Sequence, residues 1–146
     1  MSIAPAPRVV LAERLARRDH LHGTWWPYSA DIEEELTPML NVVGARFGFV
    51  RGVRLNREEW PGTPISWQPA AGKRTRISWY GTQEPRTAVL LCGDHNKLVL
   101  LVLPPDTPEA VALSATFLAC TPGNSLTGEQ ALHKAASGER SSSGLH

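Results

Sequence analysis

The sequence predicts a single α+β domain, an antiparallel sheet of about five or six strands with two packed helices. Two nearly uninterrupted apolar runs, Arg86–Cys92 and Lys97–Leu103, flank a short Gly-Asp-His-Asn link, which is typical of a central β-hairpin. Apolar residues at helical spacing follow a capping signal at Asp31. A second helical segment, 107–120, follows a Pro-Pro pair. The length of 146 residues is enough for one domain.

The amino-terminal part of the chain leads into an aromatic cluster. Residues 1–7 are small and proline-rich and predict a loose lead-in, and 8–15 predict a strand, with a helix as the competing interpretation. Pro27 confines the tryptophan stretch that precedes it to an edge strand or an extended segment. Because neighbours in an extended segment point to opposite faces, we expect Trp26 to be buried and Trp25 to be more exposed.

The first helix starts at Ser29 or Asp31. Asp31 and Glu34 match a capping box, and the apolar positions that follow form one helical face: Ile32, Leu36, Leu40 and Val43. Pro38 predicts a kink or two abutting helical pieces. Gly44 or Gly48 is expected to end the helix.

The middle of the chain predicts strands over 47–55, 65–68 and 74–80, with a bulge at the glycines of the first and a turn at Trp60-Pro61-Gly62. A helix over 107–120, capped by Asp106 or Thr107, is expected to pack four apolar side chains on the sheet: Val111, Leu113, Phe117 and Leu118. The domain therefore spans 8–120. Residues 121–146 are rich in Ser, Gly and Ala and are expected to be largely disordered, with one short helix near 129–136.

Composition limits the setting in which the protein works. With 42% apolar and 20% charged residues and a formal net charge of +1, the chain is typical of a soluble globular protein without a global field for nucleic acid or membranes. The amino terminus lacks the apolar core of a signal peptide, and the longest apolar run, Leu98–Leu103, is far shorter than the ~20 residues that span a bilayer. We expect a cytoplasmic protein with no membrane partner.

The sequence predicts no catalytic residue, metal site or cofactor. Cys92 with Asp94 and His95 resembles a nucleophile beside a base, but Cys92 ends a buried strand, where cysteine is usually inert. His20 and His22 could share a strand face, but no third ligand stands at a diagnostic spacing, so a solvated loop is favoured. An enzyme is therefore the third hypothesis for the function.

Basic and aromatic residues give the candidate binding positions. Residues 46–86 carry eight basic and three acidic side chains, a local charge of +5. Basic side chains interleaved with rings on a sheet are typical of single-stranded nucleic-acid binding, although a solvated sheet face explains them too. The candidate binding residues are Trp25, Trp26, Tyr28, Trp60, Arg74, Arg76 and Trp79.

Three sequence elements together resemble a family. The pattern Gly23-x-Trp25-Trp26-Pro27-x-Ser29, then Asp31, Glu35-Leu36 and Trp60, then Leu100-Leu101-Val102-Leu103-Pro104-Pro105-Asp106, is similar to a family of short actinobacterial proteins known only as a domain of unknown function. The similarity covers about residues 8 to 120. Tyr28 departs from the basic residue expected there. The resemblance implies the fold and no activity.

The function expected from these observations is that of a non-catalytic binding or accessory module with an unknown partner. Self-association into a homo-oligomer is compatible with this role. The alternative is a nucleic-acid-binding protein that uses the arginine- and tryptophan-rich sheet face.

Overall fold

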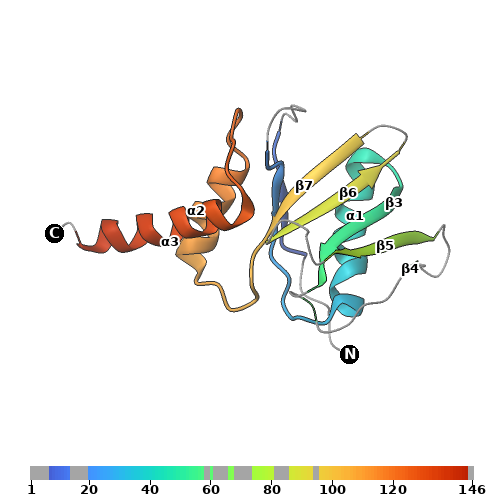
Figure 1. Ribbon diagram of the computed structural model, residues 1–146, viewed down its shortest axis with the longest axis horizontal. Coiled ribbons are helices and arrows are strands. Elements are labelled where there is room, and N and C mark those ends of the chain that lie inside the picture. Colours follow the sequence, from blue (N-terminus) through green and yellow to red (C-terminus); the bar gives the residue numbers. More distant parts are fainter. Residues whose placement is uncertain are drawn as a thin grey trace.

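The computed structural model describes residues 7–13, 20–57, 60, 66–67, 74–80, 86–93 and 96–144. One sheet carries helix α1 on one face, while α2 and α3 pack together at the end of the sheet formed by β2 and β7 (Figure 1). The elements in chain order are β1 (Val9–Leu11), β2 (Gly23–Trp25), α1 (Ile32–Phe47), β3 (Val50–Asn56), β4 (Ser66–Trp67), β5 (Thr75–Tyr80), β6 (Thr87–Cys92), β7 (Asn96–Val102), α2 (Glu109–Ala119) and α3 (Gly128–Gly144).

The α+β class is confirmed, but the sheet is mixed and not purely antiparallel as predicted. Within the described residues the strands lie in the order β1-β2-β7-β6-β3-β5-β4, and the pairs β2–β7 and β3–β5 are parallel. The predicted hairpin is confirmed as the antiparallel pair β6–β7 at the centre of the sheet. Hydropathy patterns report which faces of a strand are buried, but not which strand becomes its neighbour. The two parallel pairs join strands that are distant in the sequence, so local patterns could not reveal them.

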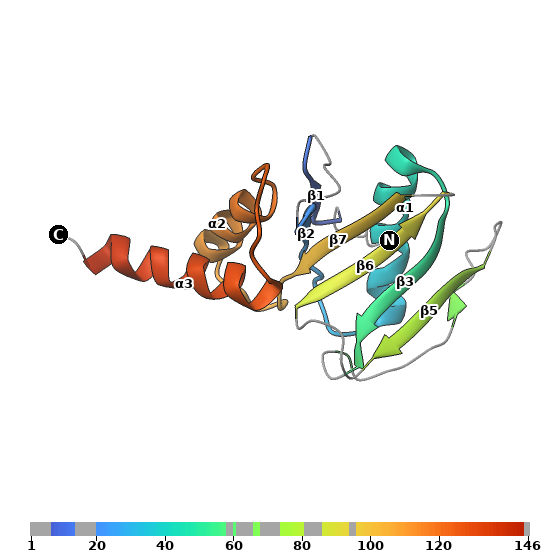
Figure 2. The same cartoon turned by 45° about the horizontal axis from the view of Figure 1, so that its top comes forward.

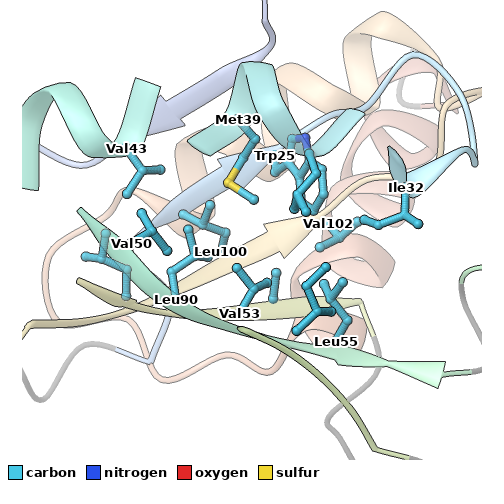
Figure 3. Close-up of a cluster of buried hydrophobic side chains, with 14 of the residues drawn as sticks. Trp25, Ile32, Met39, Val43, Val50, Val53, Leu55, Leu90, Leu100 and Val102 are labelled. Atoms are coloured by element: carbon cyan, nitrogen blue, oxygen red, sulfur yellow. The ribbon is translucent and has the colours of Figure 1, made fainter. Parts of the chain in front are cut away.

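The main core lies between α1 and the sheet. Figure 3 shows side chains of β3, β6 and β7 meeting those of α1, with Trp25 of β2 beside them. The labelled residues are Trp25, Ile32, Met39, Val43, Val50, Val53, Leu55, Leu90, Leu100 and Val102. Burying one such aliphatic side chain contributes about 1.5–3 kcal/mol, so this layer is the main source of stability.

Helix α1 begins as predicted at Asp31, although the capping partner differs. The Asp31 carboxylate accepts the Glu33 N–H at 3.0 Å, and the carboxylate that folds back over the helix start belongs to Glu35 rather than to Glu34. The helix runs through Pro38 as one element, without division into two pieces. It ends at Gly48, whose φ of 87° lies in the left-handed region that favours glycine.

The strand predicted over 8–15 is shorter in the structure, and the tryptophan stretch does not form an edge strand. β1 covers three residues, and residues 14 and 15 lie outside the described part of the chain. β2 pairs with β1 on one side and with β7 on the other. Pro27 leaves this pairing intact because it comes after the strand has ended at Trp25.

A second core joins α2, α3 and the opposite face of β7. The buried side of α2 consists mainly of small residues, Val111, Ala112, Ala115 and Ala119, which face Leu101 and Leu103 of the sheet region and Ala131 and Ala135 of α3. The Asn124 side chain ties the α2–α3 connection to residue 21, because its Oδ1 accepts the Leu21 N–H and its amide donates to the Leu21 carbonyl. The short helix expected near 129–136 lies within the longer α3, and two of its alanines are buried.

Helix α2 also differs from its predicted orientation. Leu113 and Phe117, expected on the sheet, are 66% and 73% exposed, because alanines occupy the inner face instead. The helix begins at Pro108 without a side-chain cap, since the Thr107 hydroxyl donates to the Pro104 carbonyl at 2.7 Å. Exposed large apolar side chains are typical of contact surfaces. The self-association expected from the sequence is not tested by this exposure and stays a prediction.

Among the described elements no helix covers the second face of β6, β3 and β5, the face turned away from α1 (Figure 2). The cross-strand register places Arg76, Gly52, Leu91 and Lys97 in one row across this face. Arg54 lies in the next row, between Ser78 and Val89. We call this surface the uncovered sheet face.

Candidate functional site

The pairing of β1 with β2 positions the most distinctive side-chain cluster of the molecule. Val9 lies opposite Trp25, and the Trp26 N–H donates to the Arg8 carbonyl at 2.8 Å, so Arg8 and Trp26 form a cross-strand pair. The two backbones approach closely at Gly23, whose φ is 153°. A Cβ atom there would lie 2.2 Å from the Val10 carbonyl oxygen. Glycine is thus required for the close approach that places Arg8 beside the aromatic residues.

Arg8 is clamped by rings and by backbone carbonyls. Its Cζ lies 3.8 Å from the centroid of the Trp26 ring and 3.7 Å from that of Tyr28, so aromatic faces cover the guanidinium. Its Nε donates to the Trp26 carbonyl and its Nη2 to the Pro27 carbonyl, both at 3.0 Å. Cation–π contacts stabilise by about 0.5–2 kcal/mol, and these charge-assisted hydrogen bonds fix the plane of the guanidinium.

The start of α1 closes the other side of the cluster. Glu35 accepts the Tyr28 N–H at 2.8 Å through Oε1 and the Ser29 hydroxyl at 3.0 Å through Oε2. The carboxylate therefore holds the 27–29 turn against the helix and keeps the Tyr28 ring over Arg8.

A pocket of about 350 Å³ lies between these elements. Pro7 and Arg8 line it from β1 and its lead-in, residues 25–29 from β2 and the turn, and Glu34, Glu35, Pro38 and Met39 from α1. We call it the Arg8 pocket. Its walls are mostly apolar or aromatic with a few polar groups, which is the usual composition of a ligand site.

Two opposite charges in the Arg8 pocket lack charged partners. Among the described residues, no carboxylate oxygen lies within 4.0 Å of an Arg8 nitrogen, and Nη1 of Arg8 has no hydrogen-bond acceptor. Glu34, one turn into α1, is exposed, and its carboxylate has no partner within the same described ranges. Both groups are therefore available to a ligand.

The two adjacent tryptophans point to opposite faces, as predicted, but with the roles reversed. Trp25 is 2% exposed and stacks on Trp60, with ring centroids 5.3 Å apart and planes at 24°. Trp26 is half-buried against the second core, and its Nε1 donates to the Pro104 carbonyl at 3.1 Å. Alternation predicts that neighbours diverge, but the position of α1 decides which face is the core.

Trp60 is a core residue in the structure. It is 5% exposed, and its indole N–H has no hydrogen-bond partner in the described part of the chain. It lines a small cavity of about 30 Å³ together with Pro27, Arg86 and Pro104. The turn predicted at Trp60-Pro61-Gly62 lies outside the described residues except for Trp60 itself.

The arginine- and tryptophan-rich sheet face is only half formed. Arg74 and Arg76 are exposed, and Arg76 lies on the uncovered sheet face. Trp79, however, is partly buried against the main core on the opposite face. Tyr80 is 43% exposed and lies on the same face of β5 as Arg76 and Ser78, so β5 presents an aromatic ring on the uncovered sheet face.

Two of the other chemical candidates, Cys92 and His22, are buried in the structure. Cys92 is fully buried, and this burial raises the pKa of its thiol to about 11 despite the opposing effect of Arg51. The thiol therefore stays protonated at neutral pH. Asp94 and His95 lie outside the described residues. His22 is buried rather than solvated, and its Nδ1 accepts the Val99 N–H at 3.0 Å. Across the described ranges, no group of three potential metal ligands is brought together.

Sequence reasoning missed Arg8, Glu34 and Glu35 as site residues. In the sequence Glu35 stands out only as part of the family pattern, and Arg8 only as the first residue of the strand predicted over 8–15. The spacing between Arg8 and Trp26 carries no local signal, because the two meet only through strand pairing. Of the predicted binding residues, Trp25, Trp26 and Tyr28 line the Arg8 pocket.

Comparison with known proteins identifies a family and no activity. None of the helices in the described ranges is both long and apolar enough to cross a membrane. No curated protein and no solved structure is significantly similar to the chain. The model of a family of unknown function, DUF5994, matches residues 8–119, in agreement with the resemblance inferred from the sequence. Part of the pattern on which the resemblance was based lines the Arg8 pocket, namely Trp25, Trp26, Pro27, Ser29 and Glu35. The chain therefore belongs to the DUF5994 family of unknown function.

Proposed function

We propose that this protein is a non-catalytic binding module and that the Arg8 pocket is its ligand site. The observation that carries the proposal is the clamped guanidinium, which lies in a pocket with three of its N–H groups unpaired among the described residues. A donor that is already held in place loses little conformational entropy when a ligand binds. The volume of the pocket is at the lower end of the range of small-molecule sites.

The proposal is tested by a fragment screen on the full chain, read by amide chemical shifts in NMR. Fragments are expected to shift residues around Arg8, Tyr28 and Glu34. Arg8→Lys keeps the charge but loses the planar fork, so it should weaken the fragments that bind there. Arg46 offers a matched control, because its Nη2 also donates to a backbone carbonyl, that of Glu13, and its Cζ lies 4.9 Å from the Phe47 ring centroid. If hits gather elsewhere, or if Arg46→Lys weakens them equally, the pocket is not the ligand site.

The uncovered sheet face supports a second candidate function, the binding of single-stranded nucleic acid. Arg54 and Arg76 are diagonal neighbours at about 7–8 Å between Cα atoms, and Lys97 lies in the row of Arg76. Among the described residues none of the three has an acidic partner, and strands β3, β5, β6 and β7 contain no acidic residue. A second copy of this chain would place like charges together, which disfavours it as the occupant.

Anisotropy of a labelled oligo-dT at low salt tests this second candidate. Neutralising three phosphates predicts a slope of about −2 for log affinity against log salt. Arg54→Glu with Arg76→Glu should abolish binding, whereas Lys134→Glu on exposed α3 should not. This candidate is excluded if no oligo-dT binding is detected at low salt. It is also excluded if Lys134→Glu weakens binding as much as the Arg54→Glu and Arg76→Glu pair does.

A further inference from the structure

We propose that the Arg8 pocket recognises a small zwitterion with an apolar body, that is, an α-amino acid with an apolar side chain. This inference rests on the proposed function and names its ligand class. The pocket contains one cation and one anion that have no partners among the described residues and that do not pair with each other. A ligand with both charges can satisfy both groups, whereas a ligand with one charge is repelled by one of them.

The cationic group is shaped for a carboxylate. The Nε and Nη2 hydrogen bonds to the carbonyls of residues 26 and 27 occupy one side of the Arg8 fork, and the Trp26 and Tyr28 rings cover its faces. Both N–H groups of Nη1 and one of Nη2 remain at the end of the fork. Two parallel N–H donors in a plane match the two oxygens of a carboxylate. Arg8 therefore presents only its edge to the pocket.

The anionic group suits an ammonium. Glu35 is already engaged through both oxygens, by the Tyr28 N–H and the Ser29 hydroxyl. Glu34 is not engaged by any described residue and lies beside it on the pocket wall. No oxygen of Glu34 lies within 4.0 Å of an Arg8 nitrogen, so the two groups do not pair with each other. An amino acid carries both complementary charges, an ammonium for Glu34 and a carboxylate for Arg8.

The remaining wall is apolar and adaptable. Pro38 and Met39 of α1 and Pro7 line it, and Met39 is fully buried at its base. Methionine adapts to differently shaped apolar groups. A volume of about 350 Å³ suits one amino acid with a side chain such as that of leucine, methionine or phenylalanine.

The experiment is an NMR titration of the full chain with L-phenylalanine and two derivatives that each lack one charge. N-acetyl-L-phenylalanine has no ammonium, and L-phenylalanine amide has no carboxylate. The parent amino acid is expected to shift the residues of the Arg8 pocket and to bind about tenfold more tightly than either derivative. Glu34→Gln, at an exposed position, should weaken the parent about tenfold and strengthen the N-acetyl derivative, because the repulsion is removed. Arg8→Lys should weaken the parent, and Arg46→Lys should leave it unchanged.

Three results would overturn the inference. If N-acetyl-L-phenylalanine binds as tightly as the parent, and Glu34→Gln strengthens the binding of both, the pocket binds anions. The proposed function would then stand. If L-phenylalanine amide binds more tightly than the parent, the pocket binds cations, and the proposed function would again stand. Leucine, methionine and phenylalanine are each added to about 10 mM, which is ten times a millimolar dissociation constant. If none of them shifts the amide signals of the pocket residues, amino acids are excluded as ligands. If the fragment screen is also silent in the pocket, the proposed function fails as well.

Discussion

Replacing Gly23 by alanine should separate the edge strand from the sheet and so disturb the Arg8 pocket. The added Cβ would lie 2.2 Å from the Val10 carbonyl oxygen and 3.0 Å from the Leu11 Cα. Ordinary contacts of a Cβ begin near 3.4 Å, so the β1 backbone would have to move by more than an ångström. Among the described strands β1 pairs only with β2, and Arg8 directly precedes it, so this movement would also displace the guanidinium.

The expected cost has two parts. A non-glycine residue at a positive φ such as 153° costs about 1–3 kcal/mol, and forcing atoms into a packed site costs about 1–3 kcal/mol more. The sum, about 2–6 kcal/mol, corresponds to a fall in Tm of roughly 5–25 °C for a chain of this size. Gly44→Ala is the matched control. It stands within α1, and no atom outside the helix's own backbone lies within 4 Å of the position that a Cβ would take there. Alanine should therefore stabilise the helix by up to about 1 kcal/mol.

Chemical denaturation of both variants measures the two effects, and the NMR titration then reports on the pocket. The same chemical change should shift stability in opposite directions, with pocket binding lost only in Gly23→Ala. A Gly23→Ala variant within about 0.5 kcal/mol of the wild type would refute the close-approach argument. So would an alanine at Gly44 that destabilises more than one at Gly23.

Three further predictions concern the cores. Trp25→Ala should cost about 3–5 kcal/mol of unfolding free energy and Trp26→Ala clearly less, because only the first ring is fully buried; equal costs in urea denaturation would contradict this difference. The thiolate form of Cys92 is disfavoured only in the folded state, so stability should be intact below pH 9 and fall as pH rises from 9 towards 11, and Cys92→Ala should remove that part of the pH dependence. Truncation after Gly123 removes α3 with its two buried alanines, so calorimetry should show a Tm lower by roughly 5–10 °C; an unchanged Tm would mean that α3 adds no stability.

Much of the fold could be predicted because its signals are local. The cap at Asp31, the closing glycine at Gly48 and the β6–β7 hairpin each depend on neighbouring residues, and each is present. The bulge expected from the glycines of the strand 47–55 also occurs, between Val50 and Gly52. These features need only backbone preferences and short-range periodicity.

The parts that could not be predicted depend on distant partners. Leu113 and Phe117 are apolar enough for a core, but the small residues of α2 allow closer packing, and so the large ones point outward. The carboxy-terminal helix is longer than the short one expected near 129–136, and the burial of its Ala131 and Ala135 depends on the neighbouring helix α2. The composition of a segment describes only the segment itself and carries no information about a helix that packs against it.

The candidate site could be predicted only on its aromatic side. Trp25, Trp26 and Tyr28 stand out in the sequence because three rings occur within four positions. Arg8 becomes part of the site only when β1 pairs with β2, and Glu34 only when α1 packs beside them. A single arginine or glutamate has no sequence signature for such a role.

The parallel pairing of β2 with β7 has a consequence for the order in which the molecule assembles. Thr24 pairs with Leu101, so closing this ladder requires a loop that contains about half of the chain, whereas β6 and β7 meet through a short hairpin. Loop-closure entropy favours early formation of the hairpin and late attachment of β1 and β2. The segment that joins last is held by short strands at one edge and is expected to be the first to open in the native state, with faster amide hydrogen exchange than β6 and β7. Because Arg8 and its two aromatic neighbours belong to that segment, the pocket would open and close with local unfolding, and its occupant would slow the exchange of β1 and β2 above all.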